Sequence, residues 1–224
     1  MASLICLPGH RRQSKGTIGM SGSPQTEIVM PWHEQSTNEQ DLWLHSRIER
    51  KLAANGIDPS VARHAKVKDS FVAEIVQKLS RNRVIVLLHE SPSVHRYLSH
   101  IIPTVYSHNY HRSSFLVTPA VYDGLIGSTQ APDHEAQMQK ALNSRLIYFD
   151  QFLSIRTARD RFSSASYTLF EEWTNGRHAL VLASQEKPET KKSGILTRIS
   201  SKYGDFALAA IEEESEFIIV GESK

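Results

Sequence analysis

Polar residues in the second half of the chain have the types and spacing of a ligand-binding crevice. Asp150 ends one run of four apolar residues, and Ser184 with Gln185 ends another. If both runs are buried parallel strands, these groups meet at the carboxyl edge of the sheet, where open α/β sheets bind their ligands. Arg198 follows in an apolar context that would fix the position of its guanidinium group.

The elements that would position these residues are strands alternating with helices. Apolar runs predict buried strands at 84–88, 115–118, 146–149, 180–183 and 217–220. Helical spacing of apolar residues predicts helices at 68–79, 93–107, 120–127, 134–143, 157–175 and 194–211. This alternation predicts an α/β fold, with a parallel five-stranded sheet and helices on both faces.

Length and composition set the domain plan. The 224 residues suit a disordered tail at 1–38, a helical segment at 39–80 and an α/β domain at 81–224. A net charge of +2 is too small to indicate a nucleic-acid partner by itself. The single cysteine, Cys6, favours a reducing compartment, and no apolar run is long enough to span a membrane. We therefore expect a cytoplasmic protein, with a nucleoid or organelle location left open.

The tail has an unusual charge pattern. Residues 1–26 contain Arg11, Arg12 and Lys15 but no acidic residue. This pattern is typical of a transit peptide, of a basic arm that contacts a nucleic-acid backbone, or of a solvated tail. The sequence leaves the three interpretations open.

The motif order resembles that of a known family. An acid-tipped strand, a helix, a polar-tipped strand and an arginine resemble the Walker B, sensor 1 and arginine motifs of the AAA+ ATPases. The closest similarity is to the DnaC/IstB-like helicase loaders and the DnaA-related initiators, and it covers residues from about 68 to 220. The resemblance implies a P-loop NTPase-like sheet of strand order 5-1-4-3-2, with Asp150 and Ser184 at neighbouring strand tips.

The phosphate loop of that family is not intact here. Its pattern is G-x-x-x-x-G-K-[ST], in which backbone amides and the lysine bind the phosphates. His89 and Val94 replace the two glycines, His95 stands at the lysine position and Arg96 at the hydroxyl position. Glu90 adds a negative charge where a triphosphate would lie. The resemblance therefore implies a degenerate nucleotide site.

The other motif positions have also changed. Gln151 follows Asp150 where the family has its catalytic acid, and a glutamine cannot serve as a general base. We expect Asp150 to persist as a cap or as a partner of Arg96. Gln185, at the sensor 1 position, can orient a water molecule or satisfy backbone groups at the strand end. Arg198 matches the arginine that reaches a neighbouring subunit's nucleotide, with a structural salt bridge as the alternative.

Basic residues near these motifs are candidates for nucleic-acid contacts. They are Arg156, Arg159, Arg161, Lys191, Lys192 and Lys202. The alternative for the three arginines is a solvated start of a helix. Histidines cluster between 95 and 111 but lack the spacing and the cysteine or acid neighbours of a zinc site, so no metal and no cofactor is expected.

These features predict a non-catalytic AAA+-like adaptor or subunit of a DNA replication, helicase-loading or mobile-element complex. It would act through contacts with a helicase, an ATPase or a transposition subunit, with weak DNA binding as a further option. The alternative is a sensor or ATPase that binds a nucleotide or phosphate ligand through a divergent loop, with His95 or Arg96 in place of the lysine.

Overall fold

The computed structural model describes residues 46, 49–50, 53–54, 69–81, 84–127, 133–154, 164–175, 177–187 and 191–220. The tail predicted at 1–38 lies outside these ranges, as does most of the helical segment predicted before residue 69. The described residues between 46 and 54 are helical, and Nε of Arg50 donates to the Ser46 carbonyl at 3.1 Å. No helix in the described ranges is long and apolar enough to cross a membrane.

The central element is a five-stranded parallel sheet in the order β2-β3-β4-β1-β5. Its strands are β1 (Val84–His89), β2 (Ser114–Val117), β3 (Leu146–Phe149), β4 (Ala179–Gln185) and β5 (Ser215–Val220). Read from the other edge, this is the predicted order 5-1-4-3-2. The predicted fold class and strand order are therefore confirmed.

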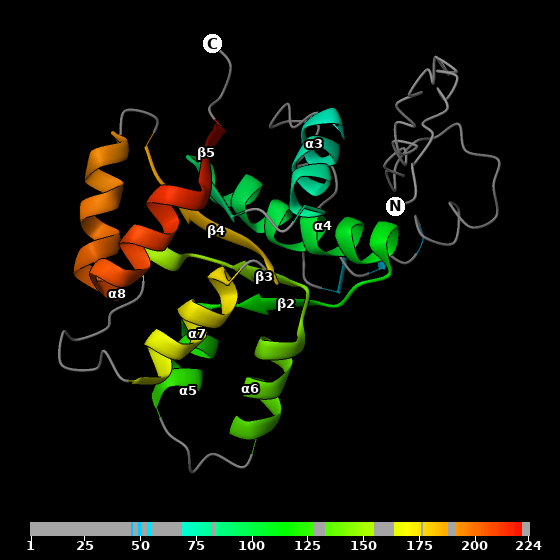
Figure 1. Ribbon diagram of the computed structural model, residues 1–224. Coiled ribbons are helices and arrows are strands. Elements are labelled where there is room, and N and C mark those ends of the chain that lie inside the picture. The colour runs from blue at the N-terminus through cyan, green and yellow to red at the C-terminus, as the bar shows by residue number, and fades with distance from the viewer. Residues whose placement is uncertain are drawn as a thin grey trace, which may run out of the picture.

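Helices cover both faces of this sheet (Figure 1). They are α3 (Asp69–Leu79), α4 (Pro92–Tyr110), α5 (Pro119–Gly127), α6 (His134–Asn143), the 3₁₀ turn η1 (Phe152–Ser154), α7 (Ser164–Thr174) and α8 (Lys192–Glu214). The helices α3 and α4 pack on one face, and α5 to α8 with η1 contribute to the core on the other. Alternate residues of β1 point to opposite faces of the sheet. Ile85 and Leu87 lie in the core with α3 and α4, while Val86 lies in the core to which α8 contributes.

Two predicted boundaries are wrong. The sequence predicted a helix ending at residue 211 and a strand beginning at residue 217, but α8 continues to Glu214 and β5 begins at the next residue, Ser215. The amide of Ser215 still donates to the Ile211 carbonyl, so the chain passes from helix to strand without a loop. In addition, β4 continues through Ser184 to Gln185, because both residues pair in register with β1.

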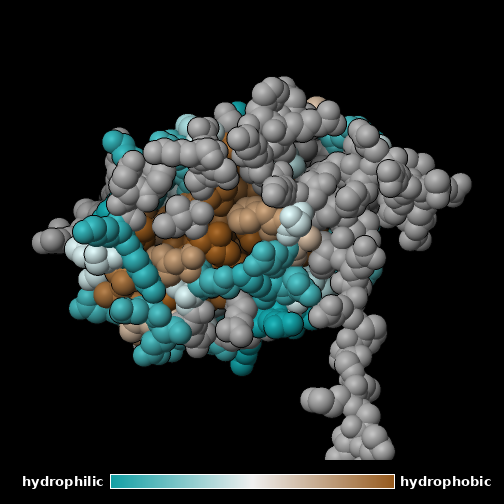
Figure 2. All heavy atoms as spheres, turned by 90° about the horizontal axis from the view of Figure 1, so that it is seen from above, coloured by the Kyte–Doolittle hydropathy of each residue, from teal (hydrophilic) through white to brown (hydrophobic). Residues whose placement is uncertain are grey.

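The strand β5 lies at an edge of the sheet, and its apolar side chains are only partly buried. Phe217, Ile218 and Val220 of β5, with Phe71 of α3, pack against the core while retaining some exposure. Figure 2, seen from above relative to Figure 1, shows an apolar area among the described residues of that face. Within the described ranges β5 pairs only with β1.

The helix α8 is broken at Gly204, where φ is 84° and ψ is 170°. Its buried residues recur at every fourth position: Ile195, Ile199, Tyr203, Ala207 and Ile211. In a straight helix of 3.6 residues per turn, each such step rotates the side chain by about 40°, so the last residue would point away from the sheet. The break at Gly204 lets both halves of α8 pack on the same core.

We expect Gly204→Ala to destabilise the fold by about 1–3 kcal/mol, because residues with a side chain rarely adopt this backbone conformation. A Cβ at this position would meet no atom within 4 Å, so the cost comes from the backbone and not from a clash. Gly194 is the matched control, since it lies in α8 without a positive φ and also has open space around its Cβ position.

Urea unfolding of both variants checks this prediction. Gly194→Ala should leave the free energy of unfolding unchanged or raise it by about 1 kcal/mol at most, since alanine favours a helix over glycine. Equal losses in the two variants would contradict the role assigned to the break at Gly204.

Candidate functional site

The predicted site residues meet at the carboxyl edge of the sheet. His89 is the last residue of β1, Gln185 is the last residue of β4, and the two pair in register. Phe149 of β3 pairs with Leu182 of β4, so Asp150 leaves β3 beside the end of β4. Asp150 and Ser184 are therefore at the ends of neighbouring strands, as predicted.

The junction between β1 and α4 is very short. Only Glu90 and Ser91 separate the strand from the helix, which begins at Pro92. The Ser91 hydroxyl accepts a bond from the Val94 amide at 3.5 Å, and a proline suits the first helical position because it needs no amide partner there. The sequence thus starts the helix early, so Val94 and His95 fall in the first turn of α4, and Arg96 directly after it, rather than in a phosphate-binding loop.

Within that turn, His95 lies between the ends of two strands. Its Nδ1 faces Nε2 of His89, and its Nε2 faces Oδ1 of Asp150. Nδ1 of His89 in turn faces the Ser91 carbonyl at 3.1 Å. The side chains of His89 and His95 are only 1% and 3% exposed. We refer to His89, His95 and Asp150 as the histidine–aspartate cluster.

This arrangement corrects one expectation. The sequence offered a cap role or Arg96 for Asp150, but the structure places His95 against the carboxylate. The reason is the helical geometry of α4, which turns His95 toward the sheet and leaves Arg96 exposed. The side chain at the lysine position of the family motif is thus paired with the acid of the Walker B position.

Burial sets the charge state of one ring. Burial and the neighbouring His95 lower the pKa of His89 to about 3, against weaker opposing effects of the Ser91 carbonyl and Asp150. His89 is therefore neutral at ordinary pH. Burial and the Asp150 carboxylate also raise the pKa of Tyr148, whose hydroxyl has no hydrogen-bond partner.

Hydrogen bonds join the end of β4 to the junction before α4. Nε2 of Gln185 donates to the Glu90 carbonyl at 2.9 Å, and the Glu186 amide donates to the His89 carbonyl at 2.9 Å. Of the two roles predicted for Gln185, the structure gives it the backbone contact. Gln151 has a left-handed φ of 53°, and its Oε1 accepts a bond from Ser154 at 3.1 Å.

Arg198 forms the salt bridge that the sequence left open. Its Nη1 lies 2.5 Å from Oε1 of Glu186, with the arginine side chain 43% exposed and the glutamate 10% exposed. Lys202 is near enough that burial and Arg198 lower its pKa. Sequence reasoning missed Glu186. Its position directly after a buried strand, the same signal that marked Asp150, could have indicated it.

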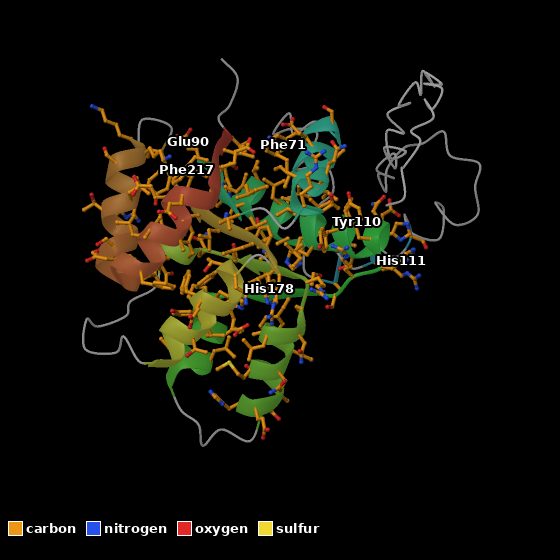
Figure 3. All side chains as sticks on the ribbon, viewed as in Figure 1. Phe71, Glu90, Tyr110, His111, His178 and Phe217 are labelled. Carbon is orange, nitrogen blue, oxygen red and sulfur yellow. The ribbon has the colours of Figure 1, made fainter. Side chains whose placement is uncertain are left out.

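The structure describes only some of the residues predicted to contact nucleic acid. Lys191 and Lys192 are exposed at the start of α8, and Nζ of Lys192 lies 4.4 Å from the centre of the Phe217 ring. Figure 3 shows Phe217 and Glu90 toward the same end of the molecule. Arg156, Arg159 and Arg161 lie outside the described residues. In the described part of the chain, no three histidine, cysteine or acidic residues are placed to hold a metal ion.

Comparison with solved structures places this geometry in a known fold. The crystal structure of the DnaC helicase loader aligns with 88% of this chain and 99% of its own, with a TM-score of 0.53 and 8% sequence identity. The chain has a DnaC-like P-loop NTPase fold. No protein-family model and no curated protein sequence matches it. At this identity, the DnaC likeness establishes the fold alone.

We expect the stability of this DnaC-like domain to fall in acid because His89 is buried as a neutral ring. The unfolded chain binds a proton on this histidine below about pH 6.5, whereas the folded protein binds it only near about pH 3. The stability that His89 contributes is thus complete above pH 6.5 and is lost as the pH falls toward 3. The slope from this group is at most about 1.4 kcal/mol per pH unit.

Urea unfolding at a series of pH values, on the parent and on His89→Asn, measures this slope. The asparagine keeps a donor for the Ser91 carbonyl but cannot titrate. Below pH 6.5, the slope of the free energy of unfolding against pH should therefore be smaller in the variant, by nearly the amount that corresponds to one proton. Parallel curves for the two proteins would show that the ring is not buried in its neutral form.

Proposed function

We propose that this chain is a non-catalytic, DnaC-like adaptor in a DNA replication, helicase-loading or mobile-element complex. The observation that carries the proposal is the contact of His95 with Asp150, which joins the residues at the lysine and Walker B positions. The two groups that would face a bound nucleotide face each other instead. The fold shared with the DnaC helicase loader supports the choice of complex.

The residues at the carboxyl edge of the sheet also disfavour binding of a triphosphate. A nucleotide would have to displace His95 from a buried pair and would lie beside the exposed Glu90. The short junction between β1 and α4 leaves few backbone amides to bind phosphate. Two or three missing charged hydrogen bonds, each contributing about 1.5–3 kcal/mol, weaken binding by roughly a thousandfold or more.

The purified chain should therefore not hydrolyse ATP and should bind it weakly or not at all. Calorimetry with ATP and magnesium, beside a phosphate-release assay, measures both properties. His95→Lys should not restore turnover, since Gln151 still lacks a basic carboxylate and positioning, charge and base act together. Micromolar binding with turnover that disappears in Asp150→Ala would overturn the non-catalytic proposal.

A contact surface for a partner is provided by α8. The Glu186 salt bridge occupies one Nη of Arg198, while the guanidinium group has five N–H donors and remains partly exposed. Lys202, half-buried one turn further along, adds a second positive charge. An anionic group of a neighbouring subunit, such as a bound nucleotide, is the ligand that this surface suits. Lys191 and Lys192 extend the positive surface and are the described candidates for DNA contacts.

Arg198→Ala tests the adaptor role. The arginine is half exposed, but Glu186 is only 10% exposed, so loss of its partner should cost about 1–3 kcal/mol and lower the melting temperature by roughly 2–10 °C. Affinity capture on the full chain from native cells should retain an ATPase, whose activity is several-fold lower with the variant than with the parent chain.

Arg145→Ala is the matched control, because Arg145 is also exposed and lies at the opposite edge of the sheet, where it donates to the Arg177 carbonyl. It should leave both the captured ATPase and its activity unchanged. A large loss of stability in Arg198→Ala with an unaffected ATPase would instead assign the arginine a purely structural role.

The alternative function is a sensor that binds a phosphate ligand through the altered loop. It is favoured by Arg96, which is exposed directly after the first turn of α4, near the helix N-terminus whose dipole attracts anions. Calorimetry with pyrophosphate distinguishes the two functions. Binding that is lost in Arg96→Ala supports the sensor, and its absence in the parent supports the adaptor.

A further inference from the structure

The histidine–aspartate cluster links three elements through consecutive contacts. They run from the Ser91 carbonyl to His89, from His89 to His95, and from His95 to Asp150. Nε2 of His95 and Oδ1 of Asp150 are buried and have no hydrogen-bond partner besides the ion-pair contact with each other. The cluster is thus the polar attachment of the first turn of α4 to β1 and β3, beside the packing of Val94 in the core.

Counting hydrogens gives the charge of the cluster. Each of the three contacts joins two atoms that both carry lone pairs, so each needs one hydrogen to be attractive. The Ser91 carbonyl supplies none, and two neutral imidazole rings supply two. The third hydrogen is an additional proton, carried by a ring or by the carboxyl group. With every contact satisfied, the cluster has no net charge.

We propose that the histidine–aspartate cluster is a proton-dependent attachment of α4, which holds one extra proton when closed and releases the first turn of α4 when that proton is lost. Without the proton, one contact would set two lone pairs against each other in a buried place. The cluster would also carry a net negative charge, on a carboxylate whose side chain is only 20% exposed. Both effects favour separation of α4 from the strand ends.

The position of the proton follows from the surroundings. The lowered pKa of His89 makes this ring the neutral donor to Ser91, so the extra proton is shared by His95 and Asp150. Tyr148 of β3 faces Asp150, and its raised pKa keeps its own hydroxyl protonated.

The other charged groups around the cluster do not replace the proton. Glu186, after β4, is paired with Arg198 of α8. Glu90, next to His89 in the chain, and Arg96, next to His95, have exposed side chains. On α3, Lys78 is paired with Glu74 and with Glu216 of β5. These charges are paired with one another or exposed to water, which screens them from the cluster, so the attachment should respond to pH.

Amide hydrogen exchange on the full chain tests the proposal. The His95 amide donates to the Ser91 carbonyl at 3.0 Å and reports opening of the first turn of α4. If opening releases one proton, the opening constant rises by about tenfold per pH unit above neutrality, after correction for the intrinsic exchange rate. The Gln137 amide, which donates to the Asp133 carbonyl in the first turn of α6 at 2.9 Å, should show no such rise.

Isosteric variants identify the group responsible. Asp150→Asn removes the carboxylate that shares the proton, so the pH dependence at the His95 amide should disappear. Asp133→Asn, which removes an exposed carboxylate at the start of α6, should leave it intact. A flat profile in the parent, or the same rise in Asp150→Asn, would overturn the proposal.

Nitrogen NMR of the rings gives a second measurement that needs no variant. Near neutral pH, the parent should show both ring nitrogens of His95 protonated and only Nδ1 of His89 protonated. A neutral His95 beside an ionised Asp150 would leave one contact without a hydrogen and would contradict the proposal even if Asp150→Asn failed to fold. The inference concerns the free chain and does not depend on the adaptor role.

Discussion

A buried parallel sheet needs partners for the polar groups at the ends of its strands, because a helix packed over them removes their water. At the carboxyl edge of this sheet, α4 provides those partners through His95, which contacts both His89 and Asp150. This requirement explains the early start of the helix at Pro92, since a longer loop would move His95 away from the strand ends. Through the same contacts, the His95 ring occupies the place beside these strand ends.

The fold was largely predictable because it depends on signals that are local in the sequence. Continuous apolar runs such as the one that became β1 indicate strands buried on both faces, and the helical spacing between them requires parallel connections. The strand order came from the resemblance of the motif sequence to the AAA+ ATPases, and the sheet confirms it. The end of α8 was predicted too early, at residue 211, because an acidic last turn of a helix and an acidic loop have the same composition.

The contacts within the site were less predictable because they depend on the third dimension. The sequence identifies His95 as the residue at a lysine position, but only the rotation of α4 brings its ring to Asp150 and turns Arg96 outward. The pairing of Glu186 with Arg198 likewise depends on the approach of α8 to the end of β4. Periodicity does not reveal the break at Gly204, since buried residues at every fourth position also fit a continuous helix over short stretches.

The direct passage from α8 into β5 has a mechanical consequence. No loop separates Glu214 from Ser215, so the second half of α8 cannot move independently of β5. The strand β5 is in turn hydrogen-bonded along its length to β1. A rotation of that half would strain the sheet itself. The half that carries Arg198 lies on the other side of Gly204, so the direct connection to β5 does not restrain it. A displacement of the half that carries Arg198 therefore need not be transmitted to β5.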